Sequence, residues 1–201
     1  DTLNNLIASG DQIIKIQAVL SGSLNFVFNN FKKGASFHDV VLQAQQEGYT
    51  EPDPKIDLSG IDVARKILIL ARESGMRIEL EEIENESFLP QECLDTQDNK
   101  SFFESLVKHS DHFEKMLEKA KKDGAKMKYV AQLENAKAKV GIQVVKEGHN
   151  FYNLEGSDTS SILYQSLQRT TFNVKGAGAG ADVTASGIFA DIIRMESSNY
   201  G

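Results

Sequence analysis

The spacing of apolar residues changes near Gly124 from mainly helical to mainly alternating, and that change limits the folds that the chain can adopt. Before Gly124, most segments place apolar residues three and four apart, as amphipathic helices do. After it, and in an early stretch over residues 12–20, apolar and polar residues alternate as in half-buried strands. Helices and strands that occupy separate stretches are typical of the α+β class. We therefore expect a largely antiparallel or mixed sheet with helices packed on one face.

Glycines, prolines and capping residues set the expected bounds of the segments. Prolines at positions 52 and 54 exclude a helix interior over residues 49–57, so we expect a fixed acidic loop there. A last helix is expected after Gly180, and it presents Ala185, Ile188, Phe189 and Ile192 on one face. Residues 2–8 form a short amphipathic stretch, and the other predicted helices cover residues 24–34, 36–48, 59–74 and 100–122. The predicted strands cover residues 12–20, 129–133, 138–145, 151–154, 161–167 and 171–174, with 83–90 extended and a hairpin turn at Glu147-Gly148.

Composition and charge exclude several classes of function. There are 22 Lys and Arg against 29 Asp and Glu, and the net charge of −7 argues against nucleic-acid binding. The lysines from Lys115 to Lys139 are interleaved with acidic residues, which predicts a solvated face. No apolar run approaches the ~18–20 residues of a membrane helix, and no signal peptide opens the chain. Cys93 is the single cysteine and no Cys/His set has zinc spacing, so we expect no metal site and a reducing, cytoplasmic location.

The segment from Glu51 to Lys66 holds the residues best suited to chemistry. The carboxylates of Glu51, Asp53, Asp57 and Asp62 lie on the acidic loop and at the start of the helix that follows it. Lys66 comes four residues after Asp62, so the two side chains share a helix face. In that setting a lysine can donate a proton to a carbonyl oxygen, while carboxylates hold a cationic amine of the substrate.

A structural interpretation of the same residues stays open. An Asp–Lys pair four residues apart is most often an exposed ion pair that contributes well under ~1 kcal/mol. Ser59 and Asp62 also fit a capping box, which would make Asp62 a structural residue. The proline-stiffened loop favours a functional site, because sites are commonly built on rigidly held loops.

Two segments with glycine lie where a strand is expected to lead into a helix. Ser21-Gly22-Ser23 could hold a carboxylate or phosphate with free backbone N–H groups, or could simply cap the helix. The run Gly176–Gly180 could approach a pyrophosphate closely. It is not a Rossmann fingerprint, because it lies at the far end of the chain and not after a first strand.

Together these segments resemble the homoserine dehydrogenase family. Glu51-Pro52-Asp53-Pro54, followed by Asp57-Leu58-Ser59-Gly60-Ile61-Asp62-Val63-Ala64-Arg65-Lys66, is closely similar to the family's signature. Leu20-Ser21-Gly22-Ser23-Leu24-Asn25 upstream and Gly176–Gly180 through Thr184-Ala185 downstream match in the family's order. The resemblance covers essentially the whole chain and is weakest over residues 91–150. Residues 70–90 are most similar to bifunctional aspartokinase–homoserine dehydrogenases.

This resemblance implies an activity and a set of site residues. The family reduces L-aspartate 4-semialdehyde to L-homoserine with NADPH or NADH, on the route to threonine and methionine. Lys66 would be the catalytic residue that gives a proton to the aldehyde oxygen. The implied substrate-binding residues are Glu51, Asp57, Asp62, Gly22, Ser23, Tyr49 and Thr50. The implied cofactor-binding residues are Gly178, Gly180 and Thr184.

The resemblance also carries expectations about domains and partners. In the family, a Rossmann domain and a loop that holds a monovalent cation precede the segment that this chain resembles. Residues 1–201 are therefore expected to be the substrate-binding and dimerisation domain, to form a homodimer, and to show negligible turnover without the nucleotide-binding domain. At position 56 the family usually has an Asp, where this chain has Ile56, which weakens the local negative charge.

A second hypothesis is a non-catalytic module that dimerises or binds an effector through the strands after residue 126. A catalytic module would keep Lys66 and its carboxylates in one pocket, whereas a structural module could scatter them.

Overall fold

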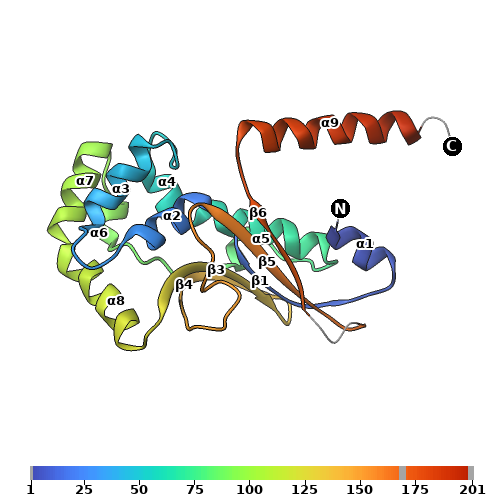
Figure 1. Ribbon diagram of the computed structural model, residues 1–201, viewed down its shortest axis with the longest axis horizontal. Coiled ribbons are helices and arrows are strands. Elements are labelled where there is room, and N and C mark those ends of the chain that lie inside the picture. Colours follow the sequence, from blue (N-terminus) through green and yellow to red (C-terminus); the bar gives the residue numbers. More distant parts are fainter. Residues whose placement is uncertain (1, 168–170, 199–201) are drawn as a thin grey trace.

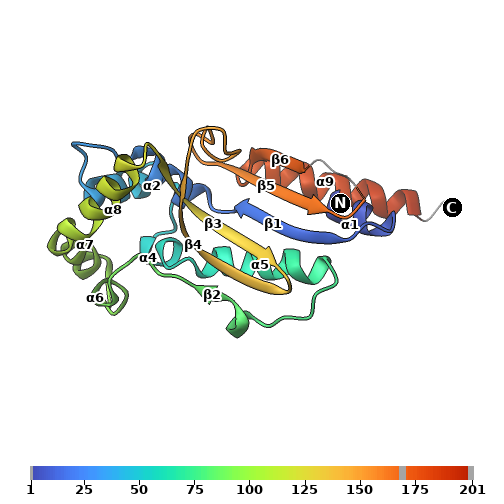
Figure 2. The same ribbon diagram turned by 90° about the horizontal axis from the view of Figure 1, so that it is seen from below.

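The computed structural model describes residues 2–167 and 171–198, and its strands form one sheet in the order β2-β4-β3-β1-β5-β6 (Figures 1 and 2). The β2–β4 pair is parallel, and the other neighbouring pairs are antiparallel. The predicted α+β class with a largely antiparallel, mixed sheet is therefore confirmed. The strands are β1 (Ile13–Val19), β2 (Glu84–Asn85), β3 (Lys126–Glu134), β4 (Lys137–Val145), β5 (Asp158–Gln165) and β6 (Phe172–Ala177).

The helices pack on one face and at one end of this sheet. Figure 2 shows β1, β3 and β4 in front, with α5 behind them and with α7 and α8 at one end. The helices are α1 (Thr2–Ala8), α2 (Gly22–Asn30), α3 (Phe37–Gln46), α4 (Pro54–Leu58), α5 (Ile61–Glu73), α6 (Gln91–Leu94), α7 (Asn99–Lys108), α8 (Ser110–Lys122) and α9 (Ala181–Ser198), with a 3₁₀ turn at Leu80–Glu82.

The main core lies between the sheet and α2 and α5. Alternate residues of β3 are buried in it: Met127, Tyr129, Ala131 and Leu133. Residues at helical spacing on α5 pack against the same core: Val63, Ala64, Ile67 and Ala71. Burying a large apolar side chain contributes roughly 1.5–3 kcal/mol, so this face fixes the position of α5 on the sheet.

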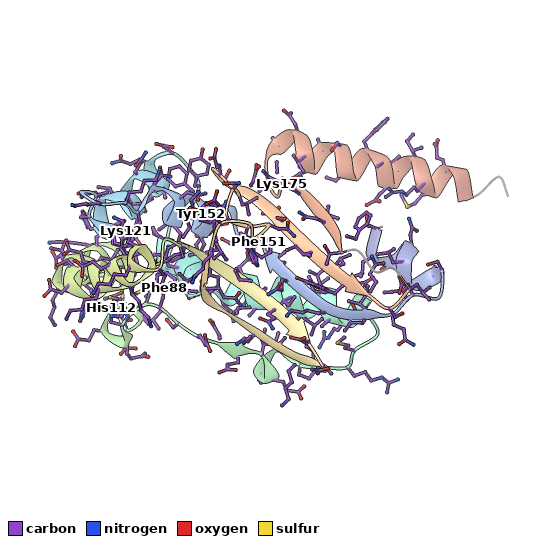
Figure 3. All side chains as sticks on the ribbon, turned by 60° about the horizontal axis from the view of Figure 1, so that its bottom comes forward. Phe88, His112, Lys121, Phe151, Tyr152 and Lys175 are labelled. Atoms are coloured by element: carbon purple, nitrogen blue, oxygen red, sulfur yellow. The ribbon has the colours of Figure 1, made fainter. Side chains whose placement is uncertain are left out.

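The opposite face of the sheet carries no helix within the described ranges and is partly covered by residues 146–157, the connection between β4 and β5. Figure 3 shows Phe151 and Tyr152 on this connection. A second, smaller cluster lies beneath it and contains Val19, Val130, Val145, Phe151, Leu154 and Ile162. The remainder of this face is polar, with Lys15 and Glu134 paired at 3.3 Å.

The predicted single helix over residues 100–122 is wrong, because the structure has two helices that meet at His109. The backbone of His109 has φ −100° and ψ 21°, which ends α7 and begins α8. The break lets Phe102 of α7 and Phe113 of α8 both reach the main core. Helical spacing of the apolar residues continues across the break, so the pattern alone gives no sign of it.

The predicted strand over residues 151–154 and the predicted hairpin turn at Glu147-Gly148 are also wrong. Residues 146–157 form a connection made of turns and contain no strand. Phe151 and Leu154 are buried because they pack on the sheet. The hairpin turn instead joins β3 to β4 at Asn135 and Ala136, with φ of 53° and 58°. Positive φ at both central residues is the geometry of a type I′ turn, one of the two common turns of two-residue hairpins.

The acidic loop contains the short helix α4, which the two prolines do not predict. Pro54 opens it, where a missing N–H costs no helical hydrogen bond. Asp53 caps it by accepting a hydrogen bond from the backbone N–H of Lys55 at 3.0 Å. Elsewhere, the extended segment 83–90 is strand only in β2, and β6 runs on through Gly176-Ala177 into the small-residue run.

The last helix, α9, extends away from the rest of the described chain (Figure 1). The predicted apolar face of α9 is present, but it is exposed to solvent: Ile188, Phe189 and Ile192 are between 46% and 65% exposed. Neither α9 nor any other helix within the described residues combines the length and hydropathy needed to cross a bilayer.

Candidate active site

A cavity of about 390 Å³ lies where β1 ends and the chain turns into α2. Its lining comes from this turn, from residues 48–57, from α5, from the start of β5, and from the end of β6 with the segment that follows it. Of the predicted site residues, the cavity brings together Gly22, Ser23, Tyr49, Glu51, Asp57, Asp62, Lys66, Gly178 and Gly180. The residues expected to act together therefore share one pocket.

The amino end of α2 forms one wall of this cavity. Ser21 caps the helix, since its Oγ accepts a hydrogen bond from Leu24 N at 3.1 Å. Gly22 has no room for a side chain, because a Cβ there would lie 2.9 Å from the carbonyl oxygen of Ser157. The capping interpretation of this segment is confirmed at Ser21, while Gly22 and Ser23 line the cavity.

Asp57 joins α2 to the acidic loop. Its Oδ1 accepts a hydrogen bond from Ser23 Oγ at 2.8 Å, and its Oδ2 accepts one from the backbone N–H of Glu51 at 2.9 Å. The carboxylate is half-buried, and both of its oxygens have partners within the protein. Asp57 therefore sets the position of Glu51, whose own side chain is exposed at the cavity.

Lys66 and Asp62 form the charged centre of the cavity. Lys66 Nζ lies 2.8 Å from Asp62 Oδ2 and donates a hydrogen bond to Leu20 O at 3.1 Å. The two side chains are 45% and 49% exposed, as in a surface ion pair, but the bond to Leu20 ties Lys66 to the end of β1. The predicted Ser59–Asp62 capping box is wrong: Gly60, with φ 76°, precedes α5 and the helix has no side-chain cap.

The opposite wall comes from β5 and from the segment before α9. Ser157 and Thr159 line it, and sequence reasoning missed both because neither belongs to a motif. A Cβ at Gly178 would lie 2.4 Å from Thr159 Cγ2, so only glycine allows this approach. Gly180 has φ +129°, a conformation that other residues rarely adopt.

Two predicted site residues do not line the cavity. Thr50 turns its hydroxyl to a neighbouring backbone oxygen at 3.0 Å. Thr184 lies in the first turn of α9, where its backbone N–H donates to Gly180 O at 3.0 Å. Tyr49 is at the edge of the cavity, with its ring stacked on Phe26 at a centroid distance of 4.2 Å.

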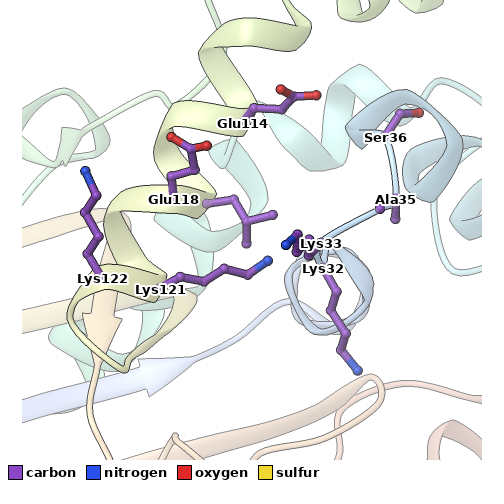
Figure 4. Close-up of a pocket in the computed structure, with 10 residues that line it drawn as sticks. Lys32, Lys33, Ala35, Ser36, Glu114, Glu118, Lys121 and Lys122 are labelled. Atoms are coloured by element: carbon purple, nitrogen blue, oxygen red, sulfur yellow. The ribbon is translucent and has the colours of Figure 1, made fainter.

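A larger hollow, of about 800 Å³, lies between α8 and the loop that joins α2 to α3 (Figure 4). Its charged lining includes Lys32, Lys121 and Glu118, all exposed. None of the signature residues reaches it, and its mixed charges are typical of a solvated face. Among the described residues, no group of three or more His, Cys, Asp or Glu side chains could hold a metal ion.

Comparison with known proteins decides the family. The homoserine dehydrogenase model matches residues 1–193. This chain belongs to the homoserine dehydrogenase family. It is 39% identical over 199 residues to a bifunctional aspartokinase/homoserine dehydrogenase of Zea mays. The matched region covers 98% of this chain and 22% of the relative. It is 40% identical over 205 residues to a homoserine dehydrogenase of Schizosaccharomyces pombe. That matched region covers 98% of this chain and 54% of the relative.

Solved structures agree with this membership. A protein of unknown function from Candida auris has a TM-score of 0.92 and 36% identity, over 98% of this chain and 57% of that one. A homoserine dehydrogenase from Thiobacillus denitrificans has a TM-score of 0.72 and 25% identity, over 96% of this chain and 41% of that one. The chain therefore spans little more than half of the Candida auris and Schizosaccharomyces pombe proteins, and only 22% of the bifunctional enzyme from Zea mays.

Proposed function

We propose that this chain is the substrate-binding part of an oxidoreductase that interconverts L-aspartate 4-semialdehyde and L-homoserine with NADPH or NADH. The observation that carries the proposal is the position of Lys66 Nζ, which lies beside Asp62 at the end of β1 in the cavity that Glu51 also lines. A substrate with an ammonium group and an aldehyde matches a site with carboxylates around one lysine. The product would feed threonine and methionine synthesis.

Two carboxylates of the cavity would bind the substrate. Glu51 and Asp62 line the cavity and carry the negative charge that an ammonium group requires, with Asp62 near the reacting oxygen. Asp57 would support them by holding the Glu51 backbone at 2.9 Å. Preorganised charge of this kind lowers the activation barrier, because it holds the aldehyde in one orientation before the reaction.

Lys66 would hold and move the proton. An ammonium group has three N–H donors. The described contacts use two of them, on Asp62 and on Leu20 O, which leaves one for the substrate oxygen. Lys66 would give this proton to the aldehyde oxygen during reduction and accept one from the hydroxyl in the reverse direction.

We assign the contacts with the nicotinamide cofactor to the segment before α9. Gly178 and Gly180 add no side chains of their own to this wall, and the first turn of α9 has backbone N–H groups without helical partners. When bound, the cofactor supplies the hydride. Gly178, Gly180 and Thr184 would contact it.

We also propose a homodimer and a cytoplasmic setting. The sheet face without a helix in the described part offers a broad, polar surface to a second copy, with Gln17, Gln132 and Gln143 partly buried on it. The free, buried Cys93 suits a reducing compartment. Sedimentation tests the dimer, and a strict monomer would contradict it.

Substrate discrimination by the full-length enzyme that contains this chain tests the function. L-Aspartate 4-semialdehyde is compared with succinate semialdehyde, which lacks only the amino group. Hydrogen bonds to charged groups contribute about 1.5–3 kcal/mol, so we expect kcat/KM to be about 10- to 100-fold higher for the amino-aldehyde. Equal values would remove Glu51 and Asp62 from amine binding. No oxidation of NADPH or NADH with either aldehyde would overturn the proposal.

A further inference from the structure

A lysine outside the charged centre is buried behind one wall of the cavity. Lys128 of β3 is 0% exposed, so the predicted solvated face over residues 115–139 is wrong at this position. Its Nζ donates hydrogen bonds to Asn25 Oδ1 at 2.8 Å, to Asn29 Oδ1 at 2.7 Å and to Leu154 O. All three ammonium donors are therefore taken by neutral oxygens.

The ammonium group fixes which way round the two amides of α2 lie. Because an ammonium can only donate, the oxygen of each Asn faces Lys128 and its Nδ2 points to the chain beyond. Asn25 Nδ2 donates to Gly156 O at 3.1 Å and to Asp158 O at 3.0 Å. Asn29 Nδ2 donates to the same Gly156 oxygen at 3.0 Å. The two amides thus hold residues 154–158 against α2.

Residues 154–158 form part of the wall that the substrate would meet. Ser157 lies within them and Thr159 follows directly, and both line the cavity. Residues 154–158 pack against α2 at two places. One is Asn25, and the other is Gly22, which lies one helical turn before Asn25 and packs against the Ser157 backbone. Lys128 itself does not line the cavity, so any effect on the substrate acts through this segment.

The three oxygens that contact Lys128 are neutral and do not compensate its charge. Burial lowers the pKa of Lys128 to about 8; Lys126 on the same strand and Lys175 of β6 also lower it, and Glu155 opposes them. α2 faces Lys128 with the two amides and has no titratable side chain. A methionine would fill this space without burying a charge, so packing alone does not explain the lysine.

We propose that Lys128 is a positioning residue of the active site. Through Asn25 and Asn29 it holds residues 154–158 against the amino end of α2, and it thereby sets the Ser157–Thr159 wall of the substrate cavity. This rests on the proposed function, because the wall affects catalysis only if the substrate binds in this cavity.

Lys128→Met in the full-length enzyme tests the role, with Lys126→Met as the matched control. Lys126 is an exposed lysine on the same strand, and its Nζ bonds Tyr152 O at 2.9 Å, outside residues 154–158. In Lys128→Met we expect the KM for the amino-aldehyde to rise about tenfold while kcat stays within about threefold, because misplacement of a binding wall weakens positioning. Amide hydrogen exchange in residues 154–158 should also accelerate. The control should change neither.

A second variant separates positioning from simple stabilisation. Asn25→Asp keeps an oxygen on Lys128 and compensates its charge, but turns an oxygen instead of an N–H toward Gly156 and Asp158. If loss of stability alone raised the KM in Lys128→Met, this variant would keep the wild-type KM, because it compensates the buried charge of Lys128. We expect the same rise in KM as in Lys128→Met, and the same faster exchange.

An unchanged KM in Lys128→Met, or a raised KM without faster exchange in residues 154–158, would overturn the inference. If Lys128→Met does not fold, Asn25→Asp and Asn29→Asp decide by the same two readouts. If the wild-type enzyme does not turn over the amino-aldehyde, the proposed function fails, and hydrogen exchange alone decides whether Lys128 holds the segment.

Discussion

Replacing Asp57 by Asn separates assembly of the site from the chemistry at Lys66. The Asp57 carboxylate accepts two hydrogen bonds, from Ser23 Oγ at 2.8 Å and from Glu51 N at 2.9 Å. Asn keeps one acceptor and turns an NH₂ group toward the other donor. Losing one hydrogen bond to a charged group costs about 1.5–3 kcal/mol, and 1.4 kcal/mol corresponds to tenfold. We therefore expect the KM for the amino-aldehyde to rise about 10- to 100-fold, with a smaller change in kcat.

Initial-rate kinetics of the full-length enzyme measure this effect, and Asp53→Asn is the matched control. Asp53 caps α4 through Lys55 N at 3.0 Å, and Asn caps helices about as well as Asp does. The control should therefore keep the wild-type KM. A wild-type KM in Asp57→Asn, or an equal rise in both variants, would refute the role of Asp57 in placing Glu51.

Further predictions concern the glycines and the buried lysine. In Gly60→Ala, a Cβ would lie 2.0 Å from Tyr129 Oη at a backbone φ of +76°. We expect a loss of about 3 kcal/mol or more, or failure to fold, and an unchanged denaturant midpoint would contradict this. Gly22→Ala pushes against Ser157 O at 2.9 Å, so we expect a higher KM for the amino-aldehyde and a stability loss of about 1–3 kcal/mol, checked by kinetics and urea unfolding. The pKa of Lys128 is about 8 in the folded protein against 10.5 for an ordinary lysine, so between these values the unfolded state binds more protons. The wild-type free energy of unfolding should therefore rise by up to about 3 kcal/mol relative to Lys128→Met as the pH goes from 8 to 10.5; parallel pH curves for the two proteins would count against it.

Local spacing was enough to predict the charged centre. Asp62 and Lys66 are four residues apart, which is about one helical turn, and the structure joins them at 2.8 Å. Spacing alone did not show whether Asp62 and Lys66 belong to an active site or form a surface ion pair. The contact that does so, between Lys66 and Leu20 O, spans 46 positions and depends on how α5 lies on the sheet.

The missed residues owe their positions to long-range pairing. Ser157 and Thr159 reach the cavity because β5 pairs with β1 and because two α2 amides hold the preceding turn. Lys128 lies in a run of charged residues that is typical of a solvated face. It is buried because its partner Asn25 lies 103 positions away in the sequence and packs over it in the fold.

The kcat of Lys66→Ala in the full-length enzyme tests proton transfer by this lysine most directly. Arg65→Ala is its control, since Arg65 is an exposed neighbour on α5 that does not line the cavity. General acid catalysis contributes about 10²–10⁴-fold, so we expect kcat to fall at least about 100-fold in Lys66→Ala and to stay unchanged in the control. A Lys66→Ala enzyme that reduces L-aspartate 4-semialdehyde at the wild-type kcat would contradict the proposed mechanism.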